Sequence, residues 1–67
     1  MISYKPLWKT LIDRDMNKEQ LRLAIGVTPQ TMTRMSKGEM VNLKIIGAIC
    51  EVLDVPVSDV IEYVKEQ

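Results

Sequence analysis

The chain has 67 residues, enough for one small domain, and we expect a single domain over residues 1–67. Hydrophobic residues make up 46% and charged residues 27%, a balance typical of globular rather than disordered proteins. Because no apolar run approaches the roughly 18 residues that a membrane span needs, and the first residues lack the order of a signal peptide, we expect a cytoplasmic protein. The single Cys50 excludes an internal disulfide and a cysteine-based metal site, and we expect it to be a small buried side chain.

The net charge is zero, but the charges are unevenly distributed. Residues 1–50 hold eight Lys or Arg against four Asp or Glu, a net charge of +4. Residues 51–67 hold one Lys against five acidic residues, a net charge of −4. This asymmetry indicates that one part of the chain faces a polyanion, with ordinary solvated surface as the alternative explanation.

The first helix is predicted to begin near Pro6, because proline suits the first turn of a helix. Four apolar residues then recur at the spacing of a single helix face: Leu7, Trp8, Leu11 and Ile12. We expect this face to pack in the core.

The second helix is predicted from its capping residues. Asn17 is a good N-cap, and Gln20 follows three residues later as in a capping box. Leu21 and Ile25 form the inner face, and Gly26 supplies the permissive backbone with which helices often end.

The third helix is expected over about residues 29–37. Thr28 precedes it as N-cap, and a proline occupies its first position. Met32 and Met35 are expected to point inward, and Gly38 closes the helix after a lysine.

The fourth helix is expected to be capped by Asn42 and to run from Leu43 to about Leu53, because Pro56 would not continue it. It carries two apolar stripes, one of Leu43, Ile46, Cys50 and Leu53, the other of Ile45, Ile49 and Val52. A helix that is apolar nearly all round is buried from several sides. The second stripe either packs in the core or contacts another copy of the chain.

The ends of the chain fit two descriptions. A fifth short helix after Ser58 would align four apolar residues, namely Val57, Val60, Ile61 and Val64. The segments 2–4 and 61–64 also fit short strands, which could pair as a small ribbon beside the helices. The predicted fold class is therefore all-α, a bundle of about five short helices, with a terminal β-ribbon as the open alternative for the ends.

A continuous polar stripe runs along the third helix. It consists of residues at positions i, i+3, i+4 and i+7, namely Gln30, Thr33, Arg34 and Lys37, with Thr31 at its border. Gln can pair with the N6/N7 edge of adenine, Arg with O6/N7 of guanine, and a Thr methyl can touch the thymine methyl. These side chains therefore have the chemistry of base readout in the major groove.

Lysines lie at or just inside helix ends, where backbone phosphates would be met. These are Lys18, Lys37 and Lys44. A solvated helix face would explain an isolated polar stripe. It explains less well the short helix–turn–helix spacing, the absence of acidic residues between Thr28 and Gly38, and the local positive charge.

The motif over residues 17–38, with its pattern L-x-x-x-I-G-V-T-P-x-T-M-x-x-M-x-K-G, resembles the Cro/C1-type helix-turn-helix domain of phage repressors and small bacterial regulators. The opening I-S-Y-K-P-L-W and the closing I-E-Y-V resemble one branch of that family. The resemblance implies a lambda-repressor-like bundle in which Gln30, Thr33 and Arg34 face bases. It also implies that Lys18, Thr28, Lys37 and the helix start at Asn42 lie near phosphates.

Three residues depart from the usual pattern of this family. Arg22 stands where a small residue is common, and we expect its stem to fold over the second helix of the motif with the charge free. Lys18 replaces a frequent Gln, a change compatible with the same phosphate contact. Pro29 replaces a polar residue that often reads a base, so the site read is expected to be shorter.

The sequence therefore predicts a sequence-specific DNA-binding transcriptional regulator whose partner is double-stranded DNA. By analogy with this fold class, two copies as a homodimer would read half-sites about one helical turn apart. An enzyme is disfavoured because the chain has no His, the commonest general base. No cofactor, metal or small-molecule substrate is expected. The alternative function is a protein-interaction module that docks a partner through its acidic, apolar C-terminal segment.

Overall fold

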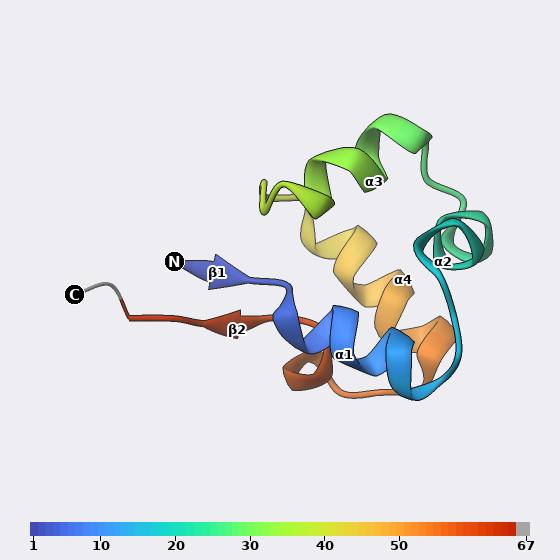
Figure 1. Cartoon of the computed structure of the whole chain (residues 1–67). Helices are drawn as coiled ribbons and strands as arrows, with labels where there is room; N and C mark the ends of the chain where they lie inside the picture. Colours follow the sequence, from blue (N-terminus) through green and yellow to red (C-terminus); the bar gives the residue numbers. More distant parts are fainter. Residues whose placement is uncertain (66–67) are drawn as a thin grey trace.

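Residues 1–65, which the computed structural model describes, form four α-helices, one short 3₁₀ turn and a two-stranded ribbon (Figure 1). The elements are β1 (Ile2–Ser3), α1 (Lys5–Asp13), α2 (Lys18–Ile25), α3 (Pro29–Ser36), α4 (Leu43–Leu53), η1 (Val57–Asp59) and β2 (Glu62–Tyr63). Residues 66 and 67, the end of the expected domain, lie outside the described residues. Within the described part, no helix is both long and apolar enough to cross a membrane.

The predicted capping of α2 is confirmed. The Asn17 side chain accepts a hydrogen bond from the backbone N–H of Gln20 at 2.7 Å, and the Gln20 side chain accepts one from the backbone N–H of Asn17 at 2.9 Å. Gly26 ends the helix with φ at +73°, in the left-handed region that glycine adopts without steric cost. Local sequence therefore fixes both ends of this helix.

The starts of α3 and α4 are confirmed as well. The Thr28 hydroxyl accepts from the backbone N–H of Thr31 at 3.2 Å, and the Asn42 side chain accepts from that of Ile45 at 3.0 Å. α4 ends at Leu53, and the C-cap residue Asp54 adopts a left-handed conformation with φ at +54°.

Of the two alternatives for the ends, the ribbon is confirmed, and the fifth helix is reduced to the 3₁₀ turn η1. After the 3₁₀ turn η1, the chain inserts Val60 into the core and then extends as β2. β2 pairs antiparallel with β1, with Ile2 opposite Tyr63 and Ser3 opposite Glu62. The pairing satisfies backbone groups of both terminal segments, whereas a helix over residues 57–64 would leave those of residues 2–3 without these partners.

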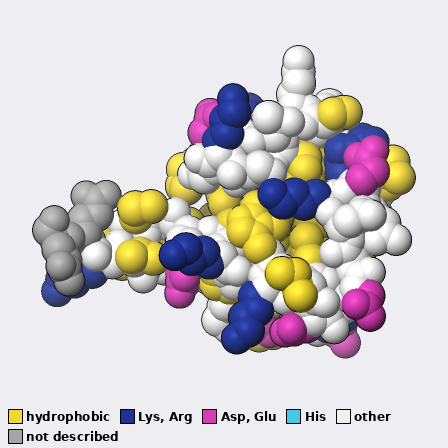
Figure 2. All heavy atoms as spheres, viewed as in Figure 1, with side chains coloured by type: hydrophobic (Ala, Val, Ile, Leu, Met, Phe, Trp, Pro, Cys, Tyr) yellow, Lys and Arg dark blue, Asp and Glu magenta, His cyan; other side chains and the backbone are white. Residues whose placement is uncertain are grey.

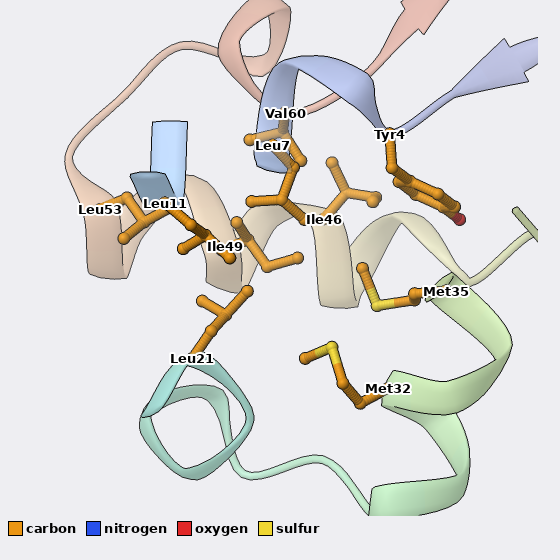
Figure 3. Close-up of a cluster of buried hydrophobic side chains, with 10 residues drawn as sticks. All are labelled: Tyr4, Leu7, Leu11, Leu21, Met32, Met35, Ile46, Ile49, Leu53 and Val60. Carbon is orange, nitrogen blue, oxygen red and sulfur yellow. The ribbon is translucent and has the colours of Figure 1, made fainter. Parts of the chain in front are cut away.

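The core is one cluster of buried side chains drawn from every helix (Figure 3). Its members are Tyr4, Leu7, Leu11, Leu21, Met32, Met35, Ile46, Ile49, Leu53 and Val60. α4 runs through the middle of the molecule and supplies three of them (Figure 1). Figure 3 shows Leu21 of α2 and the two methionines of α3 directed toward the side chains of α4. The inner positions predicted for Leu21, Met32 and Met35 are therefore confirmed.

Several apolar residues predicted to be buried lie at the surface. The exposed fractions of Ile12 and Leu43 are 74% and 78%, because these residues occupy the last turn of α1 and the first position of α4, beyond the neighbouring elements. Val52 is exposed, and Cys50 is only half-buried at the edge of the core. Helix periodicity identified the faces that pack in the core, but it did not show which residues of those faces other elements leave exposed.

Substitution of Gly26 tests the backbone conformation at the end of α2, with substitution of Gly47 inside α4 as the comparison. An added Cβ would meet no heavy atom within 4 Å at Gly26 or at Gly47, so neither substitution causes a clash. We expect Gly26→Ala to lower the free energy of unfolding by about 1 kcal/mol because of its positive φ. We expect Gly47→Ala, inside α4, to raise it by roughly 0.5–1 kcal/mol. Urea denaturation measures both, and equal effects would contradict this account of the turn.

Candidate nucleic-acid interface

A three-residue turn joins α2 to α3. The backbone N–H groups of Gly26 and Val27 both donate to the Arg22 carbonyl, at 2.9 and 3.3 Å, and close the end of α2. Thr28 then starts α3. On the inner side of α3, Met32 is 6% exposed and Met35 fully buried. These anchors fix one face of α3 and leave the opposite face to solvent.

The exposed face of α3 carries the predicted polar stripe. Gln30, Thr33, Arg34 and Lys37 are all exposed, whereas Thr31 is half-buried. The Thr31 hydroxyl lies 3.0 Å from the hydroxyl of Thr28, the residue that caps the helix. The stripe is therefore a surface feature, with Thr31 partly engaged at its border.

Two residues of the stripe have internal partners. The Thr33 hydroxyl donates to the Pro29 carbonyl at 3.0 Å, which leaves its methyl group for apolar contact. The Arg34 Nε atom lies 3.8 Å from a Glu39 carboxylate oxygen, and both side chains are more than half exposed. An exposed pair of this kind is worth little, so the guanidinium is available to another acceptor.

All five residues predicted to lie near phosphates are exposed, in different local settings. Thr28 and Asn42 use their side chains to cap α3 and α4. Lys37 follows α3 as its C-cap residue, and Lys44 lies in the first turn of α4. Lys18, at the start of α2, donates from Nζ to the Ser36 hydroxyl at 3.0 Å and lies over the Trp8 ring.

The Arg22 charge is paired, so the prediction of a free charge is wrong. Its guanidinium binds the Glu19 carboxylate through two nitrogens, with Nη2 to Oε2 at 2.9 Å, and Nη1 donates to the Val27 carbonyl at 3.2 Å. The side chain of Arg22 is 18% exposed and that of Glu19 is 63% exposed. Arg22 thereby ties the first turn of α2 to the turn that precedes α3.

Hydrogen bonds from Arg22 hold the pKa of the Glu19 carboxyl below its ordinary value, and the same contact raises the pKa of Arg22. The role of Glu19 was not among the sequence-based predictions. The i,i+3 spacing of a Glu and an Arg on one helix was the available signal.

Acidic side chains are interspersed with basic ones on the face that Figure 2 shows. Two acidic residues lie in or beside the motif, Glu19 next to Arg22 and Glu39 next to Arg34. The loop after α3 is fixed by Tyr4, whose hydroxyl donates to the Glu39 carbonyl at 2.7 Å and whose pKa is raised by burial. Among residues 1–65, no group of three or more His, Cys, Asp or Glu could hold a metal ion.

The capped helix, the glycine turn and the second helix with a buried inner face define a helix-turn-helix protein. The model of the Cro/C1-type HTH DNA-binding domain matches residues 6–66, and the chain belongs to this family. The chain is also similar to a crystal structure of the transcriptional regulator VanUg, with a TM-score of 0.91 and 48% sequence identity over 97% of this chain and 87% of that chain. No curated protein matches the chain. The resemblance seen in the sequence is confirmed.

The ion pair of Glu19 with Arg22 predicts a pH dependence of stability. Because the folded-state pKa of Glu19 is lowered, the pair stabilises the fold above the ordinary carboxyl pKa, and this contribution is lost as the pH falls through the folded-state value. We therefore expect Glu19→Gln to be less stable than the wild type at neutral pH and equally stable in acid, as measured by thermal denaturation across pH. The same substitution in an Arg22→Ala background is the control and should show a much smaller pH dependence. A stability difference between the wild type and Glu19→Gln that does not change with pH would contradict the role given to this ion pair.

Proposed function

We propose that the chain is a sequence-specific, non-catalytic transcription regulator that reads double-stranded DNA with α3 in the major groove. The observation that carries this proposal is the anchoring of α3 by two buried methionines while Gln30, Thr33 and Arg34 stay exposed. The similarity to a transcriptional regulator over nearly the whole chain supports the regulatory role. Since DNA is the partner, we also propose that the protein acts in the cytoplasm.

The proposed base readers follow from side-chain chemistry. Gln30 suits adenine, Arg34 suits guanine, and the Thr33 methyl suits thymine because the hydroxyl is already bonded to the Pro29 carbonyl. Thr31 is the least available of the four, since it is half-buried and bonded to Thr28. Each good bidentate contact contributes roughly 1–3 kcal/mol of discrimination between bases.

The proposed phosphate contacts are of two kinds. Lys18, Lys37 and Lys44 would act through their charges, whose neutralisation of phosphates makes binding sensitive to salt. Thr28 and Asn42 would act through the helix starts that they cap, where free backbone N–H groups and the helix dipole favour an anion. Such contacts set the position of the protein on the duplex and carry no sequence information.

We further propose that two copies bind as a homodimer with half-sites about one helical turn apart. Two apolar side chains beside the start of α4 support this, because Met40 and Leu43 are 52% and 78% exposed. They border an apolar hollow of about 150 Å³ that Ile2 and Ile61 also line. Exposed apolar groups gathered in this way favour contact with another protein surface.

Selection from a random pool of DNA duplexes, combined with the mass of the protein in solution with and without DNA, tests the function and the dimer together. We expect enrichment of a palindromic sequence and the mass of two chains on one duplex. Enrichment of a non-palindromic site by a single chain would overturn the dimer alone. No enrichment would overturn DNA readout and favour a module that docks a protein through the C-terminal segment, a contact that should respond little to salt.

Two substitutions separate a reader from a phosphate contact. We expect Arg34→Ala to weaken binding to the selected site by roughly 1–3 kcal/mol and to relax the preference at one base pair. Lys37→Ala should weaken binding to all sequences alike and lower the salt slope by about one. Fluorescence anisotropy at several salt concentrations measures both effects. Equal affinity of the wild type and Arg34→Ala for the selected site would exclude Arg34 as a reader.

A further inference from the structure

Lys18 differs from the other proposed phosphate contacts because its ammonium is held by two residues from other helices. The Nζ atom lies 4.3 Å from the centre of the Trp8 ring, on α1. It also donates a hydrogen bond of 3.0 Å to the hydroxyl of Ser36, the last residue of α3. Trp8 and Ser36 are 28 residues apart in the chain, yet both meet the same charged group.

The hydrogen bonds of Ser36 orient its hydroxyl toward this role. The Ser36 hydroxyl donates its own proton to the Met32 carbonyl at 3.1 Å. Its lone pairs are therefore left to accept from Lys18. Because its proton is already donated to the Met32 carbonyl, the Ser36 hydroxyl is held in one orientation and acts as a fixed acceptor.

The Trp8 ring contributes in a second way. The face of an indole ring attracts a cation within about 6 Å of the ring centre, and the distance at Lys18 falls inside this limit. Trp8 is itself half-buried against the core, so the ring is held in place. An ammonium has three N–H donors. With one bonded to Ser36, others remain for a further acceptor, and Lys18 is exposed to solvent.

We propose that Trp8 and Ser36 are positioning residues that hold the Lys18 ammonium in place to bind a DNA phosphate. This rests on the proposed function. A freely moving lysine side chain loses substantial rotamer entropy when it is fixed. Here much of that entropy is lost when the protein folds, so less is lost when DNA binds. Because Ser36 belongs to α3, the Lys18 ammonium also links the proposed phosphate contact on α2 to the proposed reading helix α3.

A double-mutant cycle on DNA binding tests this proposal, with Lys18→Met, Trp8→Leu and Ser36→Ala made alone and in pairs with Lys18→Met. The matched control is Ser36→Thr, which keeps the hydroxyl. Affinity for the selected duplex is measured at several salt concentrations. Ser36→Ala keeps the test valid if Trp8→Leu does not fold.

We expect Lys18→Met to lower the magnitude of the salt slope by about one, because one phosphate contact is lost. Trp8→Leu and Ser36→Ala should weaken binding about three- to tenfold with the slope unchanged, since the charge remains but is no longer fixed. In the Lys18→Met background they should have no further effect, and Ser36→Thr should bind like the wild type. Equal losses from Ser36→Ala with and without Lys18→Met would overturn the proposal.

An NMR measurement on the free chain separates failure of the proposal from failure of the proposed function. The ε-methylene protons of Lys18 should be shifted upfield by the Trp8 ring in the wild type, and this shift should disappear in Trp8→Leu. If the wild type binds no DNA but shows the shift, the proposed function fails and the phosphate role with it, while the held lysine stands. An unshifted resonance in the wild type would overturn the proposal even if DNA is bound.

Discussion

The burial of α4 is the constraint on which the other elements depend. Ile46, Ile49 and Leu53 lie at the centre of the core, and the other helices each place side chains against this cluster (Figure 3). A chain of this size buries only about 60% of the surface that it exposes when unfolded. It therefore has one core, and every element that contributes to it is positioned relative to the same helix. This packing also sets the position of the exposed polar face of α3.

The motif is held by local and by distant contacts. The capping box of Asn17 and the left-handed Gly26 fix the ends of α2 using neighbouring residues alone. The Arg22 guanidinium then joins α2 to the turn before α3, in a position where a smaller side chain would leave the Val27 carbonyl without this donor. The two methionines complete the arrangement by anchoring α3 to α4. The polar stripe stays exposed to solvent because the opposite face of α3 is buried in the core.

The parts of this fold that were predictable from the sequence depend on nearby residues. Capping side chains and helix periodicity identified four helices, the turn and the inner methionines, because caps and faces involve residues three or four apart. The conformation of residues 57–64 depended on pairing with the other end of the chain. The exposure of Ile12 and Leu43 depended on where neighbouring elements stop. The contact of Lys18 with Trp8 and Ser36 joins three helices, and no spacing in the sequence reveals it.

The methionine anchors of α3 have a consequence for oxidation chemistry. A thioether is apolar and flexible, whereas its sulfoxide is polar and disrupts a core. In the folded chain both sulfurs are shielded, because Met32 is 6% exposed and Met35 fully buried. An oxidant reaches the two sulfurs only when α3 detaches from the core. The polar sulfoxide then disfavours repacking of the helix. How long α3 survives oxidative conditions is therefore set by how often it detaches from the core.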